Sequence, residues 1–264
     1  MEGILFEDPT VCIHCGRAGA GPDSLCADCR DFFDKTSSRH VLSEDPFFVA
    51  YSAGFYNNFL KEAFAAYKFR GKSYWAPAFE GMLEEYVHGH PLLSKARWIS
   101  YIPMRRSREI RRGYNPSKEM ACFVSKKEGI VLLDSLRKVR RTLEQNKLSG
   151  RARRKNVEGA FEVKERDGRI SGKIWKEDQG KWISGKVPME RLQQTKGILV
   201  DDFLTTGNTM KEGLETLFEA GIPAWGLTLA SVSYPKEDEK EKGRSDEDCI
   251  GRTLNDFKRD GWKI

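Results

Sequence analysis

The segment from Ile198 to Met210 constrains the fold of this chain more than any other. Three apolar residues lead directly into Asp201 and Asp202, and a short loop of small residues then opens a helical pattern. An apolar run of this kind, preceded by a glycine, is typical of a parallel strand that is covered on both faces. The segment therefore predicts a buried strand, a tight turn and a helix, which are the components of an α/β fold.

The loop between the predicted strand and helix has the composition of an anion-binding turn. It consists of Thr205, Thr206, Gly207, Asn208 and Thr209. Its backbone N–H groups, its three hydroxyls and the positive end of the following helix would together bind an anion the size of phosphate. The carboxylates of Asp201 and Asp202 lie at the rim, where they can accept hydrogen bonds from vicinal hydroxyls. The alternative is a strand–turn–helix unit with a merely polar turn.

Two pairs of cysteines near the N-terminus have the spacing of a metal site. Cys12 and Cys15 form the first pair, and Cys26 and Cys29 form the second. Two such pairs are typical of tetrahedral zinc held by four thiolates, a closed and structural site. The alternatives are a pair of disulfides, which a chain without a secretion signal would rarely keep, or a redox motif. We assign the zinc-binding module to residues 10–32, and we treat His14 as a loop residue.

Length and composition limit the classes of protein to which the chain can belong. Its 264 residues can form one substantial α/β domain and a small module. No apolar run approaches the roughly 20 residues that cross a bilayer, and the start lacks the regions of a signal peptide. We therefore expect a cytoplasmic protein without a membrane partner.

Positive charge is concentrated in one segment. Residues 97–155 contain 18 Lys and Arg against 5 Asp and Glu, a charge of 18 − 5 = +13, whereas the whole chain carries +6. The remainder must therefore carry 6 − 13 = −7. This segment is suited to binding anions.

Alternation of strands and helices predicts a mostly parallel sheet flanked by helices. The expected strands are 47–51, 98–102, 130–133, 198–200 and 224–230, and the expected helices begin at 57 or 58 and cover 76–87, 117–127 and the residues after 208. Residues 31–45 read as a short helix and a linker. We assign residues 46–234 to this domain, whose ligands should bind beyond the carboxyl ends of the strands.

Two pieces fall outside the alternation. Residues 165–195 read as a β-hairpin insertion in which Trp175 and Trp182 pack on each other. Residues 235–264 form a charged tail, in which 236–248 alone have 11 charged residues in 13. Such a composition favours disorder or a frayed helix.

The acidic pair and its loop match the pattern Asp-Asp-x-x-Thr-Thr-Gly-x-Thr, which resembles the signature of the type I phosphoribosyltransferases. Three basic stretches, together with the cysteine module, extend the resemblance to the ComF family of late-competence proteins. The stretches are Lys68-Phe69-Arg70-Gly71, Arg112-Gly113-Tyr114-Asn115-Pro116, and Arg140-Arg141-Thr142 continuing through Gln145, Leu148, Ser149 and Asn156 to Phe161. The resemblance covers roughly residues 12 to 231. Pro116 replaces a glutamine of the family pattern, and the 165–195 insertion is longer than the family usually shows.

The resemblance implies a ligand and a reaction. The loop Thr205–Thr209 would bind the 5′-phosphate of phosphoribosyl pyrophosphate (PRPP), and Asp201 and Asp202 would bind the ribose hydroxyls. Pyrophosphate, accompanied by Mg²⁺, would leave as a nitrogen base attacks the anomeric carbon. The candidate cations for pyrophosphate are Lys68, Arg105, Arg112, Arg140 and Arg154. The acceptor is not identifiable from the sequence.

Two further functions stay open at this stage. The chain could be a non-catalytic accessory protein that handles single-stranded DNA and keeps the fold as a PRPP sensor or scaffold, because the +13 segment suits a nucleic-acid backbone. The cysteine module could also dock a competence protein that resembles a helicase.

Overall fold

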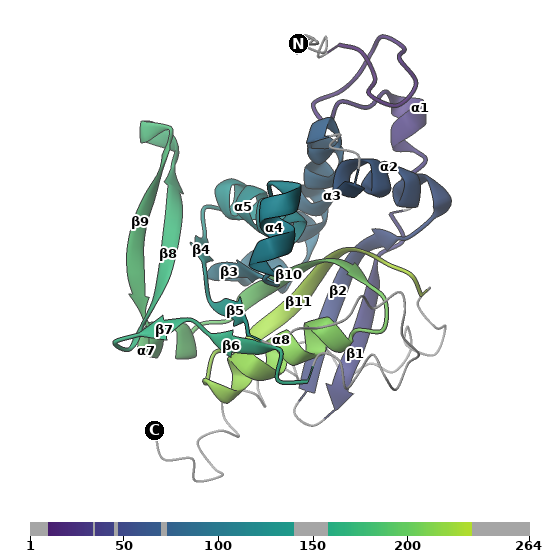
Figure 1. Cartoon of the computed structure of the whole chain (residues 1–264). Helices are drawn as coiled ribbons and strands as arrows, with labels where there is room; N and C mark the ends of the chain where they lie inside the picture. The colour runs from purple at the N-terminus through teal and green to yellow at the C-terminus, as the bar shows by residue number, and fades with distance from the viewer. Residues whose placement is uncertain (1–9, 34, 45–46, 70–72, 140–157, 234–264) are drawn as a thin grey trace. The chain divides into compact units, whose positions relative to one another are not determined.

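A mixed sheet forms the centre of the protein (Figure 1). The computed structural model describes residues 10–33, 35–44, 47–69, 73–139 and 158–233, all within one compact unit. In this part of the chain the sheet has nine strands, in the order β1-β2-β11-β10-β3-β4-β8-β7, with β9 paired to β8.

The middle of the sheet is parallel. It contains β2 (Phe47–Phe55), β11 (Ala224–Ser231), β10 (Gly197–Leu204), β3 (Trp98–Tyr101) and β4 (Val131–Leu133). In the strand register Ser231 lies opposite both Phe55 and Leu204, so the carboxyl ends of three neighbouring strands meet at one edge. That edge is where parallel sheets bind their ligands.

Antiparallel strands extend both sides of this parallel group. β1 (Ser38–Glu44) pairs with β2, while β8 (Arg169–Lys176) pairs with β4. β7 (Glu165–Arg166) and β9 (Lys181–Pro188) both pair with β8. The predicted hairpin within 165–195 is therefore confirmed, but it belongs to the sheet and does not fall outside it.

Helices cover both faces of the sheet (Figure 1). α3 (Ala76–Gly89) and α5 (Pro116–Glu128) pack on one face, where α2 (Asn58–Phe69) contacts α3 through Phe64 and Phe79. The other face is covered by α8 (Asn208–Glu219) and by a small sheet of β5 (Leu136–Lys138) and β6 (Phe161–Val163). The core cluster includes Phe48, Trp98, Leu199, Met210, Leu214 and Leu217.

The shorter elements are mostly connections. They are α1 (Ala27–Arg30), α4 (Arg106–Arg112), α7 (Met189–Gln193) and the 3₁₀ turns Ser73–Trp75, Leu93–Lys95 and Glu177–Gln179. Among the described residues, no helix combines the length and the apolar character that crossing a bilayer requires.

The predicted α/β class with a mostly parallel sheet flanked by helices is confirmed, and so are the expected strands and helices of the alternation. The expectation of a short helix and a linker over 31–45 is wrong, because Ser38–Glu44 forms an edge strand against β2. This strand has no regular apolar alternation, and only its pairing to the sheet makes it a strand. α4, β5 and β6 were also not predicted. The predicted tail, 235–264, lies outside the described residues.

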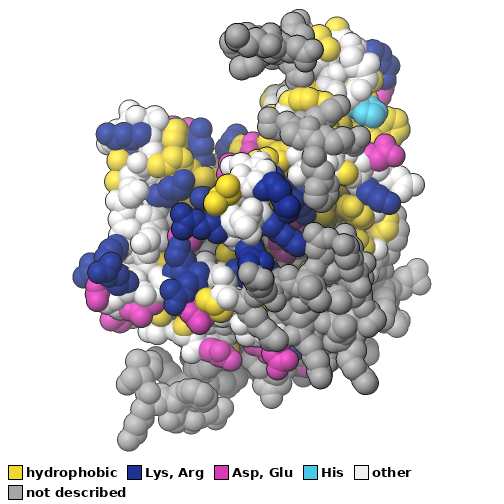
Figure 2. All heavy atoms as spheres, viewed as in Figure 1, with side chains coloured by type: hydrophobic (Ala, Val, Ile, Leu, Met, Phe, Trp, Pro, Cys, Tyr) yellow, Lys and Arg dark blue, Asp and Glu magenta, His cyan; other side chains and the backbone are white. Residues whose placement is uncertain are grey.

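Basic side chains are prominent on the face of the molecule drawn in Figure 2. On the face drawn in Figure 2, Lys and Arg side chains are concentrated over the β8–β9 hairpin and over the adjacent region of α4 and α5. The basic segment 97–155 contributes β3, α4, α5, β4 and β5 to the described part of the chain.

Candidate functional site

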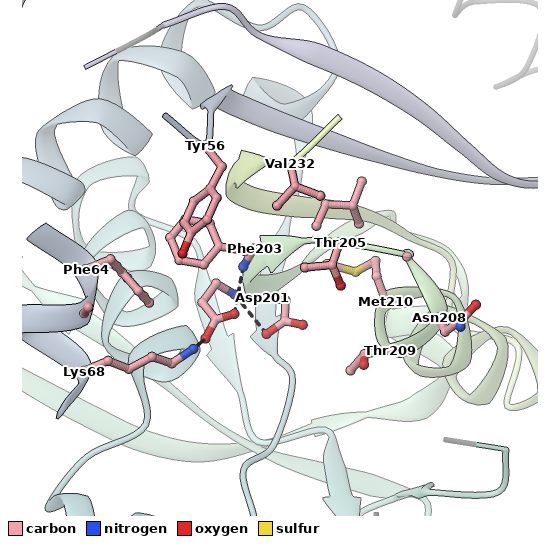
Figure 3. A pocket seen from close by; sticks show the side chains of 14 residues that line it. Tyr56, Phe64, Lys68, Asp201, Phe203, Thr205, Asn208, Thr209, Met210 and Val232 are labelled. Atoms are coloured by element: carbon pink, nitrogen blue, oxygen red, sulfur yellow. Dashed lines mark hydrogen bonds and ion pairs between the residues drawn. The ribbon is translucent and has the colours of Figure 1, made fainter. Parts of the chain in front are cut away.

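A cavity of about 330 Å³ lies at the carboxyl edge of the parallel strands (Figure 3). The end of β10, the turn that follows it and the start of α8 form one wall. α2 and the ends of β2 and β11 form the other. The lining residues are Tyr56, Phe64, Ala65, Lys68, Asp201, Asp202, Phe203, Leu204, Thr205, Gly207, Asn208, Thr209, Met210 and Val232. The structure thus brings seven of the twelve residues predicted to bind the ligand into one cavity, and Thr206, in the same turn, does not line it.

The two acids at the end of β10 have different partners. Asp201 accepts a hydrogen bond of 3.0 Å from Ser117 Oγ, at the start of α5, and one of 2.9 Å from the backbone N–H of Asp202. Burial, together with the negative charge of Asp202, raises the pKa of Asp201 to about 7. Two adjacent carboxylates in a partly desolvated cleft favour a partner that donates hydrogen bonds or carries positive charge.

Lys68 supplies positive charge to this pair. Its ammonium group forms an ion pair and a hydrogen bond with Oδ2 of Asp202, and the two side chains are 19% and 20% exposed. The same ammonium group lies 5.1 Å from the centre of the Phe64 ring. A ligand that binds to Asp202 must therefore reach a carboxylate that already has an internal counter-charge.

The turn after β10 has the geometry that an anion requires. Gly207 is the N-cap of α8 with a φ of +72°, a left-handed conformation that favours glycine. A glycine N-cap provides no side-chain oxygen for the first N–H groups of the helix, which have no partner within the helix itself. These N–H groups, with the positive end of the helix dipole, are chemically suited to hold an anion at the cavity.

An aromatic wall beside the acids was not found by sequence reasoning. The ring of Phe203 lies 4.5 Å from that of Tyr56 and 4.4 Å from that of Phe64, and Val232, at the rim, is 40% exposed. Tyr56 and Val232 directly follow the neighbouring strands β2 and β11. The position of Tyr56 and Val232 directly after predicted strands is the sequence signal for this wall. The sequence does not give the order of the strands, which is needed to place these residues beside the acids.

The basic candidates divide into three groups. Lys68 lies in the cavity. Arg112 is half-buried and lies near Asp202: burial lowers the pKa of Arg112, and the negative charge of Asp202 opposes this effect. Arg105, the exposed N-cap of α4, does not line the cavity. Arg140 and Arg154 lie outside the described residues.

Lys138, at the end of β5, is a further cation that the sequence did not single out. Burial lowers its pKa, and the nearby carboxylate of Asp201 opposes this effect. Its strand is part of the small sheet that covers the α8 face. Each acid thus has a lysine nearby: Asp201 has Lys138 from β5, and Asp202 has Lys68 from α2.

Pro116 leaves the turn before α5 intact. Asn115 caps the helix by accepting from Ser117 N at 3.1 Å, and its amide donates to the Ile102 carbonyl at 3.1 Å. Pro116 occupies the first helical position, where proline is favoured because its missing N–H would have no partner there. The proline is therefore compatible with the hydrogen bond from Ser117 to Asp201.

The four N-terminal cysteines form a cluster. One sulfur from each of Cys12, Cys15, Cys26 and Cys29 lies within 4.8 Å of the others, and the Sγ atoms of Cys15 and Cys26 are 3.7 Å apart. Four Zn–S bonds of about 2.3 Å in a tetrahedron place the sulfurs about 3.8 Å apart. The donor set and its spacing therefore fit zinc.

Polar contacts hold the two cysteine-bearing loops in place. The side chain of Arg17 donates to Cys15 Sγ at 3.4 Å, and this bond lowers the pKa of Cys15 to about 6. Arg30 holds Asp23 through two bonds of 2.5 and 2.6 Å. The ring of His14 packs against Phe59 of α2 at 4.8 Å, so the loop also contacts the main domain.

Comparison with protein-family models and with curated proteins found no match. Fold and site together define an α/β protein that places two acids beside the N-terminus of a helix, and that carries a four-cysteine cluster with the donor set of a metal centre.

Proposed function

We propose that this chain is a ComF-like protein with a type I phosphoribosyltransferase fold that binds PRPP together with Mg²⁺. One observation carries the proposal: Asp201, Asp202 and the turn that begins α8 line the same cavity at the carboxyl edge of parallel strands. A sugar phosphate needs both features within a few ångströms of each other, because its hydroxyls and its 5′-phosphate are carried by one small sugar.

Each part of the ligand has a matching group in the cavity. The N-terminus of α8, with Thr205 and Thr209, suits the 5′-phosphate, while the carboxylates of Asp201 and Asp202 suit the ribose hydroxyls. Lys68 and Arg112 provide positive charge close to Asp202. PRPP carries several negative charges, so it would be attracted to these groups.

Magnesium would arrive with the ligand. Mg²⁺ prefers oxygen ligands and commonly binds substrate phosphates together with one or two carboxylates, and the half-buried carboxylate of Asp201, which lines the cavity, fits this chemistry. When bound, the ion would neutralise charge on the leaving pyrophosphate.

Zinc at the four cysteines would be structural, because four thiolates leave no position open for a substrate.

The reaction would be a displacement at the anomeric carbon. The bond from carbon to pyrophosphate breaks as a nitrogen of the acceptor forms the new bond, and positive charge develops on the ribose. The carboxylates of Asp201 and Asp202 would hold the ribose, and their negative charge would stabilise the positive charge that develops on it. The rings of Tyr56 and Phe203 offer an apolar surface beside the ribose position, which suits a flat acceptor.

Calorimetry of PRPP with Mg²⁺ tests the binding. The wild-type protein should bind, and Asp201→Asn combined with Asp202→Asn should abolish binding, because the amides replace acceptor oxygens with donors. The matched control is Asp167→Asn with Asp178→Asn, two exposed residues away from the cavity. Equal affinity in the Asp201 and Asp202 variant would reject the assignment.

Turnover separates a transferase from a sensor. Pyrophosphate release from PRPP, screened with nucleobases and small amines as acceptors, should be measurable if the protein transfers the phosphoribosyl group. Binding without release under all conditions would instead favour the sensor, the alternative in which the fold supports another activity.

A further inference from the structure

Hydrogen bonds connect the end of β10 to the start of α5 in a closed circuit. The N–H of Ile102, directly after β3, donates to the Val200 carbonyl at 2.8 Å, and the Ile102 carbonyl accepts from the side-chain amide of Asn115 at 3.1 Å. Ser117 donates its backbone N–H to Asn115 Oδ1 at 3.1 Å and its hydroxyl to Asp201 Oδ1 at 3.0 Å. The circuit therefore begins at Val200 and returns to β10 at Asp201, the next residue.

The two polar side chains of this circuit are buried. Asn115 is 2% exposed and Ser117 is 4% exposed. Burial of a polar group is costly unless the group is hydrogen-bonded, and hydrogen bonds in such surroundings are stronger than in water. Pro116, between the two residues, has a fixed φ and begins α5. The position of the Ser117 hydroxyl is therefore set by the protein before any ligand binds.

One oxygen of the Asp201 carboxylate accepts both of its hydrogen bonds. Ser117 Oγ and the backbone N–H of Asp202 donate to Oδ1, at 3.0 and 2.9 Å. Among the described residues none donates to the second oxygen, Oδ2, which in Figure 3 lies on the side of Thr209. Because Asp201 lines the cavity, the protein holds Oδ1 and leaves Oδ2 for a ligand.

Ser117 holds Asp201 from a different element of the fold. The bond from Asp202 comes from the neighbouring residue of the same strand, whereas the bond from Ser117 comes from α5. An aspartate side chain has three staggered χ1 positions, and the bond from α5 favours one of them. If all three were equally populated, about a third of the molecules would present Oδ2 correctly, and the apparent Kd would rise about threefold.

We infer that Ser117 is a positioning residue, which orients the Asp201 carboxylate so that Oδ2 meets PRPP and its Mg²⁺. Ser117 does not line the cavity, so it acts through Asp201, and Asn115 in turn fixes Ser117. The inference rests on the proposed function, because it needs a ligand that binds to Asp201.

Calorimetry of PRPP with Mg²⁺ tests this role. Ser117→Ala should raise the Kd about threefold or more, because the Asp201 carboxylate is no longer held in one orientation. Ser117→Thr keeps a hydroxyl at this position and should restore most of the affinity. This rescue separates the bond to Asp201 from the packing of the Ser117 side chain.

The matched control is Ser125→Ala, on the same helix. Ser125 is fully buried, and its hydroxyl donates to the Ile130 carbonyl at 2.6 Å. The variant removes a buried hydrogen bond without changing Asp201. It should lower the midpoint of thermal unfolding and keep wild-type affinity, whereas a purely structural role of Ser117 predicts that both alanine variants affect binding alike.

The inference is overturned if Ser117→Ala binds PRPP as tightly as the wild type does, or if Ser125→Ala weakens binding by the same factor. It is also overturned if Ser117→Thr folds but binds no better than Ser117→Ala. The two alanine variants decide the question even if the threonine variant does not fold. A wild-type protein that does not bind PRPP would reject the proposed function itself, and this inference with it, so the two failures are distinguishable.

Discussion

Lys68, in the last turn of α2, forms an ion pair with Asp202, near the end of β10, across 134 positions of the sequence. The pair connects a helix to the strand that carries the acids of the candidate site. It also provides the counter-charge that two adjacent carboxylates need in a partly buried cleft. The family resemblance assigns these two residues to different groups of the ligand, whereas in the structure they bind each other.

Removal of Lys68 should destabilise the fold. Lys68→Gln leaves the Asp202 carboxylate, which is 20% exposed, without its ion-pair partner. A lost hydrogen bond to a charged group commonly costs about 1–3 kcal/mol, so we expect a loss in this range in the free energy of unfolding at neutral pH. Urea denaturation measures it.

The control for this prediction is Lys61→Gln, an exposed lysine on the same helix, which should change stability little. The double variant Lys68→Gln with Asp202→Asn should lose less than the sum of the two single variants, because the pair is coupled. Additive losses would show that the ion pair contributes nothing to stability.

The pH dependence of stability should report on Asp201. The pKa of this carboxyl is raised from 3.8 to about 7 in the folded protein. Between these values the unfolded chain releases the proton while the folded protein keeps it. This group therefore makes the fold progressively less stable as the pH rises from about 4 to about 7, and its full cost is present above that range.

Asp201→Asn should remove this cost. The amide oxygen still accepts the hydrogen bond from Ser117, so the main change is the loss of the ionisable group. We expect the variant to be more stable than the wild type at about pH 8 and nearly equal to it at about pH 4. Thermal unfolding across this range measures the difference, and an equal gain at both ends would rule out the titration of Asp201 as its cause.

Local sequence patterns predicted the elements that carry the site. The apolar run before Asp201 and the glycine before Asn208 define the strand, the turn and the helix, and each of these is determined by residues adjacent in the chain. The same holds for the cysteine pairs and for the Trp175–Trp182 hairpin. Buried strands, capped helices and metal-binding spacings all have short-range signals.

Features that depend on contacts between distant residues were not predictable in this way. β1 is an edge strand only because β2 lies beside it, and the attachment of β8 to β4 depends on the order of the strands. The aromatic wall at Tyr56 and Phe203 likewise requires knowing that the ends of β2 and β10 lie near each other. No local periodicity contains that information.

Chelation should release one zinc ion per chain and destabilise the N-terminal module first. Metal binding in isolated fingers amounts to about 10–16 kcal/mol, so the loops that carry Cys12 and Cys26 should lose their structure without it. Cys26→Ser removes one ligand and should prevent stoichiometric zinc binding, as measured by elemental analysis. Cys122→Ser, outside the cluster, should retain the metal. A wild-type protein purified without metal, and unable to take up zinc, would contradict the prediction.

Gly207 should be intolerant of a side chain. Its φ of +72° disfavours other residues by roughly 1–2 kcal/mol, and a Cβ atom would lie 2.7 Å from Leu42 Cδ2. We therefore expect Gly207→Ala to destabilise the protein by at least about 1–2 kcal/mol and to weaken PRPP binding, because the turn that presents the helix N–H groups must shift. Gly89→Ala, at an open position at the end of α3, is the control and should leave both properties nearly unchanged.

Adding Leu42→Ala to Gly207→Ala removes the overlap but not the backbone strain, so binding should recover only in part. Full recovery would assign the whole effect to the overlap, and unchanged affinity in Gly207→Ala itself would show that this turn does not hold the phosphate.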